Sequence, residues 1–125
     1  MIGVGVDFTA RDIQQECKAK GMPWEKAKAF DGSAPISPFT TIDQFNDINN
    51  LDFSIQINGE TKQVGNTKDM LFNFNQIIAY VSQFFTLKIG DLIYTGTPAG
   101  VGPIAINDTI DCFIEDKKML SFNVK

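Results

Sequence analysis

An alternation of apolar and polar residues that ends in Asn58-Gly59 constrains the fold of this chain more than any other stretch. Phe53, Ile55 and Ile57 alternate with polar residues, which is typical of a strand with one buried face. Asn-Gly is the preferred central pair of a type I′ hairpin turn, because both residues of that turn must adopt a positive φ. We therefore predict a β-hairpin with strands over 53–57 and 60–64.

Further strands are predicted at both ends of the chain. A last pair follows residues 107–108 and is joined by a turn over 115–118, with Ile110, Cys112 and Ile114 on one face and Leu120, Phe122 and Val124 on the return strand. The apolar, glycine-containing segment 2–6 is expected to be a strand, and 87–94 a turn followed by a strand. These segments predict a mainly β chain.

Two helices are expected to accompany the strands. Thr9 is a reasonable N-cap for a helix from Ala10 to about Lys20, and Gly21 ends it. Residues 24–40 have the composition of a packed irregular loop with one helical turn near Trp24 to Lys28. A second helical stretch opens at 67–70 and repeats apolar residues at spacings of three and four, namely Leu71, Phe74, Ile77, Ile78, Val81 and Phe85. The predicted fold class is α+β, mainly β with two helices.

Composition excludes several classes of function. The chain contains no histidine, so it cannot form a Ser-His-Asp or Cys-His arrangement or a zinc site that uses imidazole. A net charge of −4 over 125 residues argues against nucleic acid as a partner, and no apolar run reaches the length of a membrane span. The two cysteines form no CxxC motif, which favours a reduced, cytoplasmic location. Residues 1–125 are expected to form one domain.

Three places could carry chemistry, and each has a purely structural alternative. Asp7 follows the apolar segment 2–6, where its carboxylate could bind a divalent cation or could simply cap the next helix. Lys28 stands among small and aromatic residues and could hold a carboxylate or stabilise an enolate, or it could be a solvated lysine. The glycine-rich segment 95–102 could present backbone amides to an anion, or it could be a wide β-turn.

Taken together, these places resemble the core of the fumarylacetoacetate hydrolase family. The resemblance rests on blocks in the family's order: 7–14 (DFTARDIQ), 20–24 (KGMPW), 27–31 (AKAFD), 57–60 (INGE), 65–72 (GNTKDMLF) and 90–102 (GDLIYTGTPAGVG). Residues 17–21 (CKAKG) and 95–103 (TGTPAGVGP) look most like the branch that contains acylpyruvases and oxaloacetate decarboxylases.

The resemblance implies a mixed β-roll with a Mg²⁺ or Mn²⁺ site and a small 2-oxo or 1,3-diketo acid whose C–C bond is cleaved through an enolate. It implies that Asp7 is a metal ligand and that the catalytic positions Lys28 and Gln14 contact the substrate carboxylate or the developing oxyanion. It further implies that Thr97 and Gly96 bind substrate in a closing loop, and that Arg11 supports these substrate-binding residues.

The chain departs from the family ahead of Met1, where members carry a further segment with a Glu-x-Glu pair of metal ligands and a His-x-x-Glu lid. The chain contains neither motif. We therefore expect weak metal binding and no activity from the chain alone, as for a truncated product or half of a split enzyme. The alternative is a non-enzymatic domain with a vestigial anion pocket. Either way, exposed sheet edges and apolar surface favour a homo-oligomer or a complementary N-terminal segment as partner.

Overall fold

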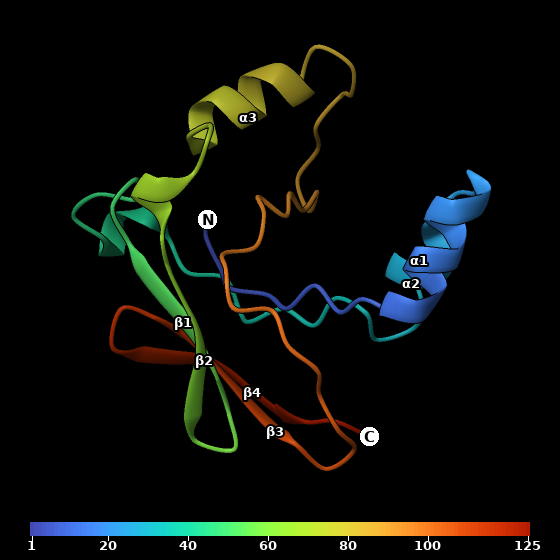
Figure 1. Cartoon of the computed structure of the whole chain (residues 1–125). Coiled ribbons are helices and arrows are strands. Elements are labelled where there is room, and N and C mark those ends of the chain that lie inside the picture. Colours follow the sequence, from blue (N-terminus) through green and yellow to red (C-terminus); the bar gives the residue numbers. More distant parts are fainter.

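The computed structural model describes residues 1–125, and its main element is a sheet of four antiparallel strands (Figure 1). The strands are β1 (Asp52–Ile57), β2 (Glu60–Asn66), β3 (Thr109–Ile114) and β4 (Lys117–Asn123). Their order across the sheet is β2-β1-β3-β4, with β1 paired to both β2 and β3. Both predicted hairpins are confirmed, and the β1–β3 pairing joins them into one sheet.

The turn between β1 and β2 has the predicted geometry. Asn58 has φ 52° and Gly59 has φ 79°, the two positive angles that a type I′ turn requires. The Asn58 side chain also reaches the second hairpin, since its Nδ2 donates to Asp108 Oδ1 at 2.8 Å and its Oδ1 accepts from the Thr109 amide at 2.9 Å. This turn therefore contributes to the contact between the two hairpins.

The buried core is small and lies mainly on β3. Alternate residues of β3 face inward, and Ile110 and Cys112 are almost fully buried. Phe122 of β4 meets Phe8 edge to face at 6.1 Å between ring centroids, so the segment before the first helix packs against the sheet. The segment that leads to Asp7 is thereby fixed relative to the core.

Residues 2–8 run antiparallel to residues 33–40 instead of forming a regular strand. Isolated bridges join Ile2 to Thr40 and Gly5 to Ile36. Pro35 and Pro38 lie in the partner segment, and because proline has no amide hydrogen it interrupts a hydrogen-bonded ladder. The predicted strand at 2–6 is thus an extended segment, and part of the expected loop 24–40 is its partner.

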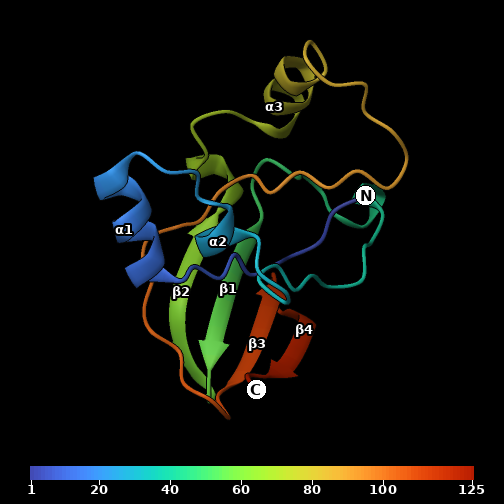
Figure 2. The same ribbon diagram turned by 90° about the vertical axis from the view of Figure 1, so that its right-hand side faces the viewer.

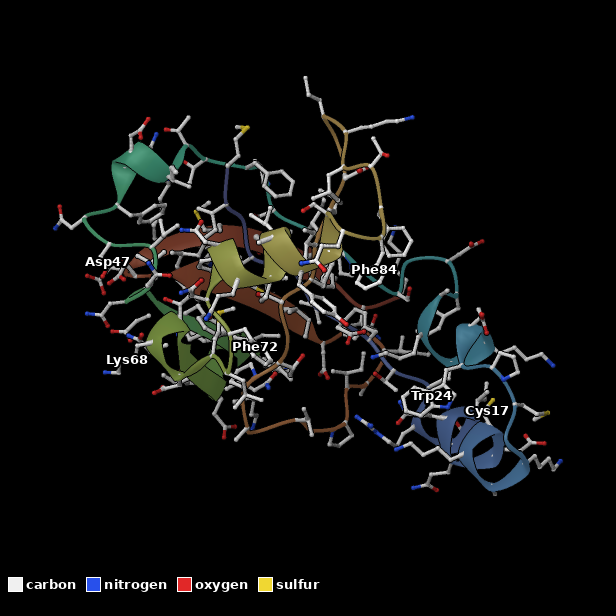
Figure 3. The ribbon with its side chains drawn as sticks, turned by 90° about the horizontal axis from the view of Figure 1, so that it is seen from above. Cys17, Trp24, Asp47, Lys68, Phe72 and Phe84 are labelled. Atoms are coloured by element: carbon white, nitrogen blue, oxygen red, sulfur yellow. The ribbon has the colours of Figure 1, made fainter.

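The three α-helices lie away from the sheet. They are α1 (Arg11–Lys20), α2 (Glu25–Lys28) and α3 (Phe74–Val81), of which α2 is the helical turn expected near Trp24. α1 and α2 lie side by side, whereas α3 stands apart (Figures 1 and 2). Seen from above, Cys17 and Trp24 lie at the α1–α2 end of the molecule, far from Asp47 and Lys68 (Figure 3). None of the three helices has the length and apolar character needed to cross a bilayer.

The starts of two helices differ from the prediction. The N-cap of α1 is Ala10, without a side-chain hydrogen bond, because the Thr9 hydroxyl accepts a hydrogen bond from Lys28 instead. Residues 67–69 form a separate 3₁₀ turn, and α3 begins after Asn73, which makes a reciprocal capping box with Gln76. The end of α1 is confirmed, since Gly21 adopts the left-handed conformation at φ 63°.

The predicted strand within 87–94 is absent, although the turn before it is present. The Asp91 amide donates to the Lys88 carbonyl at 3.1 Å, and the Lys88 amide donates to Asp91 Oδ2 at 2.7 Å. Residues 92–94 have no strand neighbour within the chain, and a strand needs a partner to satisfy its backbone groups. These residues are 36–51% exposed.

Candidate functional site

Lys28 and Asp7 form the centre of the candidate site. The Lys28 ammonium donates to both carboxylate oxygens of Asp7 at 2.6 Å and to Thr9 Oγ1 at 2.8 Å. The Lys28 side chain is 30% exposed and that of Asp7 is 40% exposed, so the pair lies at the surface within reach of a small molecule. Two of the predicted site residues thus meet across 21 positions of sequence.

Backbone hydrogen bonds bring these two residues together. The Ala10 amide donates to the Ala27 carbonyl at 3.0 Å, and the Phe8 amide donates to the Ser33 carbonyl at 2.8 Å. Within α2, Ala27 is completely buried, and the next residue, Lys28, reaches Asp7. The short helix α2 and the extended segment before α1 therefore position the lysine and the carboxylate independently of any ligand.

Gln14 and Arg11 form a second pair on α1. Arg11 Nη1 donates to Gln14 Oε1 at 2.8 Å, and Gln14 is 94% buried, with an exposed fraction of only 6%. Because its amide oxygen is engaged by the guanidinium, the orientation of the Gln14 amide is fixed by Arg11. The structure thus places Arg11 and Gln14 together, whereas the roles of both residues at a substrate stay predictions.

Tyr94 approaches the same region from the distant segment before the glycine-rich loop. Its hydroxyl donates to the Ala34 carbonyl at 3.1 Å, and its ring lies over Gly5. Burial, and to a lesser extent the negative charge of Asp7, raise the pKa of the Tyr94 phenol. The phenol is therefore a neutral hydrogen-bond donor close enough to Asp7 to sense its charge.

The glycine-rich loop 95–102 is attached to β2. Gln63 Nε2 donates to the Pro98 carbonyl at 3.0 Å and to the Ala99 carbonyl at 3.4 Å. Gly100 has φ 98° and passes so close to β2 that a Cβ there would lie 2.6 Å from the Lys62 carbonyl oxygen. None of the loop's own amides donates a hydrogen bond within the chain, so all of them are free to bind an anion or water.

The structure does not bring Thr97 and Gly96 into contact with Asp7 and Lys28. Both residues are exposed and neither makes a hydrogen bond within the chain. Gly96 has φ 121°, a conformation that strongly favours glycine. The loop is thus built around its glycines, and its contact with a substrate stays a prediction.

The residues of this chain do not form a divalent-metal site by themselves. No three acidic, cysteine or histidine side chains come together anywhere in the structure, and the one carboxylate of the site is held by Lys28. Mg²⁺ and Mn²⁺ need several oxygen ligands, and a single paired carboxylate competes poorly with water. Asp7 can therefore be one ligand of a metal only if further ligands come from outside these residues.

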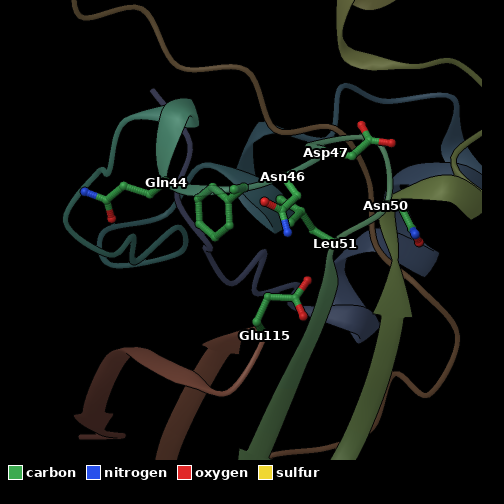
Figure 4. Close-up of a pocket in the computed structure, with 7 residues that line it drawn as sticks. Gln44, Asn46, Asp47, Asn50, Leu51 and Glu115 are labelled. Carbon is green, nitrogen blue, oxygen red and sulfur yellow. The ribbon is translucent and has the colours of Figure 1, made fainter.

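A separate cavity of about 370 Å³ lies between residues 44–51, which precede β1, and Glu115, which follows β3, and none of the predicted site residues lines it. Its lining includes Asp47, Asn50 and Glu115 (Figure 4). The two carboxylates have structural partners, since Asp47 accepts from the Asn49 amide and Glu115 from the Asp52 amide, both at 2.9 Å. The Asp7–Lys28 cluster is therefore the better candidate site.

Sequence reasoning missed two members of this cluster. Thr9 was expected to cap α1 rather than to accept from Lys28, and Tyr94 was part of a recognised block but had no role. The position of Thr9 two residues after Asp7 was a usable signal, because alternate residues of an extended segment share a face. Nothing local in the sequence indicates that Tyr94 meets Gly5 across the fold.

The chain thus combines a four-stranded antiparallel sheet, an exposed aspartate–lysine pair on the segment 2–8 and α2, and a glycine-rich loop attached to β2. The sequence matches the family model described as fumarylacetoacetate (FAA) hydrolase C-terminal over residues 2–125. The chain belongs to the fumarylacetoacetate hydrolase family, and the predicted resemblance is confirmed.

Known proteins similar to the chain include enzymes named for 2-oxo acid substrates. The chain is 48% identical over 120 residues to the mitochondrial oxaloacetate tautomerase FAHD1 of Mus musculus, covering 96% of this chain and 54% of that protein. It is 43% identical over 111 residues to the mitochondrial oxaloacetate decarboxylase of Dictyostelium discoideum, covering 89% of this chain and 51% of that protein.

A solved structure of a relative contains a metal ion. The fumarylpyruvate hydrolase of Pseudomonas aeruginosa, in complex with Mn²⁺ and pyruvate, superposes with a TM-score of 0.89 at 37% identity, and covers 98% of this chain and 52% of that one. The chain thus spans about half the length of the relatives that it matches.

Proposed function

We propose that this chain supplies one part of the active site of a divalent-metal-dependent enzyme that cleaves a C–C bond of a 2-oxo or 1,3-diketo acid such as oxaloacetate or an acylpyruvate. The observation that carries the proposal is the Lys28 ammonium held between Asp7 and Thr9 in a chain of this family. An ammonium fixed beside a candidate metal ligand suits a reaction that develops negative charge on oxygen.

The enolate is the species that the named activities of the relatives share. In decarboxylation of oxaloacetate, the bond between the methylene carbon and its carboxylate breaks, CO₂ leaves, and the electron pair remains as the enolate of pyruvate until a proton is added. In tautomerisation, a proton leaves the same methylene carbon and the resulting enolate is protonated on oxygen. The first enolate is that of pyruvate and the second that of oxaloacetate, but both place negative charge on the former keto oxygen, so a site that stabilises charge there supports either reaction.

Lys28 is the residue proposed to bear most of this stabilisation. Its three N–H donors match the three oxygens that it faces, so each donor is directed before a substrate arrives. A cation that binds Asp7 would displace the Lys28 ammonium from a carboxylate oxygen and so free one N–H donor for the developing negative charge. A substrate oxygen would replace one of the three acceptors directly. Gln14, oriented by Arg11, is proposed to donate to the substrate carboxylate.

The free amides of the loop 95–102 are proposed to complete the substrate site. Thr97 and Gly96 would bind substrate when the loop closes toward Lys28. The absence of intrachain acceptors for these amides supports this role, because anion binding by a loop uses unpaired N–H groups.

The proposed metal is Mg²⁺ or Mn²⁺, with Asp7 as one ligand and the others from outside residues 1–125. The Mn²⁺ in the structure of the Pseudomonas aeruginosa relative supports a divalent metal. The metal would polarise the keto oxygen and so acidify the neighbouring carbon. Since this chain brings together no three-ligand cluster, we propose that residues 1–125 form a single partial domain whose partner is a complementary segment or a further copy.

We also propose a reducing compartment, the cytoplasm, as the location of the protein. Both cysteines are buried and unpaired, which supports a chain that neither needs nor forms an intramolecular disulfide.

Turnover of oxaloacetate and of acetylpyruvate with Mg²⁺ or Mn²⁺ tests the proposal. We expect no turnover from the 125-residue chain alone, and turnover when a separately made segment with Glu-x-Glu and His-x-x-Glu is added. EDTA should abolish the restored activity, and Lys28→Ala should lower kcat/KM by about 10²-fold or more, as for the loss of one oxyanion donor. The matched control is Lys26→Ala, since Lys26 is an exposed lysine of the same helix.

Restored activity that survives Lys28→Ala would contradict the proposed role of the lysine. Activity of the chain alone that EDTA inhibits would contradict the expected inactivity of the isolated chain, but it would leave the proposed metal-dependent reaction standing. Failure of every combination would favour a non-enzymatic domain with a vestigial anion pocket, an alternative that the missing three-ligand cluster also supports.

A further inference from the structure

We infer that Tyr94 is a positioning residue that holds the start of the glycine-rich loop against the backbone segment leading to Asp7. The inference rests on the proposed function, because it concerns how the start of the loop with Gly96 and Thr97 is attached to the segment that carries Asp7. Tyr94 belongs to no predicted catalytic or binding position, and it immediately precedes the loop.

The first observation is the close packing of the Tyr94 ring on Gly5. A Cβ placed on Gly5 would lie 2.8 Å from Tyr94 Oη and 2.9 Å from its Cε1, which is closer than real Cβ contacts come. Gly5 is not among the glycines with positive φ, so its backbone conformation does not require glycine. The absence of a side chain at Gly5 is instead explained by the tyrosine ring that occupies the space.

The second observation is the partner of the hydroxyl group. Tyr94 Oη donates to the Ala34 carbonyl at 3.1 Å, and the next residue, Pro35, accepts from the Val6 amide at 3.0 Å. The ring and the hydroxyl therefore contact both of the paired segments, 2–8 and 33–40. A tyrosine hydroxyl is protonated at neutral pH and can donate this hydrogen bond, and burial, with a smaller contribution from the charge of Asp7, raises the pKa of the Tyr94 phenol further.

The third observation is how few other contacts hold the loop. Gln63 binds Pro98 and Ala99 in the middle of the loop, at 3.0 and 3.4 Å. Residues 95–97 lie between that attachment and Tyr94, and they make no hydrogen bonds of their own within the chain. Release of Tyr94 would leave Thr97 and Gly96 attached at one end only.

The test combines a double-mutant cycle with NMR of the 125-residue chain without substrate. Gly5→Ala should lower the urea midpoint in the wild-type background and lower it clearly less in the Tyr94→Ala background, where the space over Gly5 is free. The ¹⁵N heteronuclear NOE of Gly96 and Thr97 should fall in Tyr94→Ala toward the value at the free terminus, Lys125. Tyr94→Phe, which keeps the ring over Gly5, should restore most of that NOE.

Tyr80→Ala is the matched control, because Tyr80 lies on α3 and packs on Phe84 rather than near Gly5. It should leave the Gly96 and Thr97 signals unchanged. The inference is overturned by equal Gly5→Ala effects in both backgrounds, or by NOE values in Tyr94→Ala that match the wild type. If Tyr94→Ala does not fold, Gly5→Ala takes its place in the NMR experiment, since its added methyl displaces the same ring.

These readouts need no turnover, so they separate the two proposals. Suppose that the NOE of Gly96 and Thr97 falls in Tyr94→Ala, but the chain with its added complementary segment shows no turnover. That result would support the role of Tyr94 and contradict the proposed function. In an assembly that does turn over oxaloacetate, Tyr94→Ala should raise KM several-fold with kcat nearly unchanged, because the reacting groups are intact and only the placement of the loop is weakened. Tyr94→Phe, which keeps the ring over Gly5, should have a KM close to that of the wild type.

Discussion

Lys28 and Asp7 form an ion pair that contributes little to stability. With side chains 30% and 40% exposed, such a pair contributes at most about 1 kcal/mol to folding, because water and salt screen the charges. A large loss of activity in Lys28→Ala would therefore not come from unfolding. The small contribution to stability agrees with the functional role proposed for Lys28.

Cys112 predicts a pH dependence of stability at the level of a single thiol. Burial, with a smaller contribution from the charge of Asp111, raises the pKa of Cys112 from 9.0 to about 11. The thiol loses its proton at a lower pH in the unfolded chain than in the folded chain. The contribution of Cys112 to the free energy of unfolding is therefore complete below pH 9 and is lost as the pH rises toward 11.

Urea midpoints measured between pH 8 and pH 11 check this expectation, with Cys112→Val as the comparison. The midpoint of the wild type should fall more steeply than that of the variant, which has a side chain of similar size and no ionisable group. Parallel curves would show that the folded and unfolded thiols ionise alike.

Among the elements, the two hairpins were predictable and their mutual arrangement was not. Strict alternation and the Asn-Gly pair define β1 and β2, and alternation alone defines β3 and β4. The pairing of β1 with β3 joins residues more than fifty positions apart, for instance Ile57 with Ile110. The strand expected at 92–94 failed for the same reason, since an apolar run predicts a strand only if a neighbour is there to pair with it.

Asn58 allows the contact between the hairpins to be tested. Asn58→Ala should be less stable than Asn58→Gly by about 1 kcal/mol, because alanine at φ 52° is strained and glycine is not. Both should be less stable than the wild type, because each loses the hydrogen bonds to Asp108 and Thr109. Loss of the Asn58 amide should also move the Asp108 pKa upward, since that amide helps to hold it low.

Equilibrium unfolding of the wild type, Asn58→Ala and Asn58→Gly gives the order of their stabilities directly. NMR titration of the Asp108 carboxyl carbon checks the expected rise in its pKa. A wild-type stability in Asn58→Gly would show that the side-chain link between the hairpins is dispensable.

As a whole, the molecule exposes an unusual amount of apolar surface. Only 10 of its 125 residues are buried, and α3 with the segments on either side of it presents several large exposed side chains, including Leu71, Phe72, Tyr80, Phe84, Phe85 and Ile89. Surface of this kind is costly in water and is typical of a region that another chain covers.

We expect the chain to associate at tens of micromolar in sedimentation velocity. The double variant Phe84→Ser with Phe85→Ser should shift the distribution toward the monomer, because it removes two rings that are each about two-thirds exposed. Ile42→Ser, an exposed apolar residue on the 3₁₀ turn Ile42–Gln44, serves as the control and should leave the distribution unchanged. A monodisperse wild-type monomer would contradict the expectation.

The sequence by itself determined the local features of this protein: the hairpin turn at Asn58-Gly59, the end of α1 at Gly21 and the family to which the blocks belong. These depend on backbone preferences and on side-chain order, which act over a few residues. Only the tertiary structure decided that Lys28 donates to Asp7 and Thr9, that Tyr94 lies over Gly5, and that the two hairpins share one sheet. Such contacts join residues far apart in the chain, and they form only when burial of the core and closure of the backbone hydrogen bonds bring those segments together.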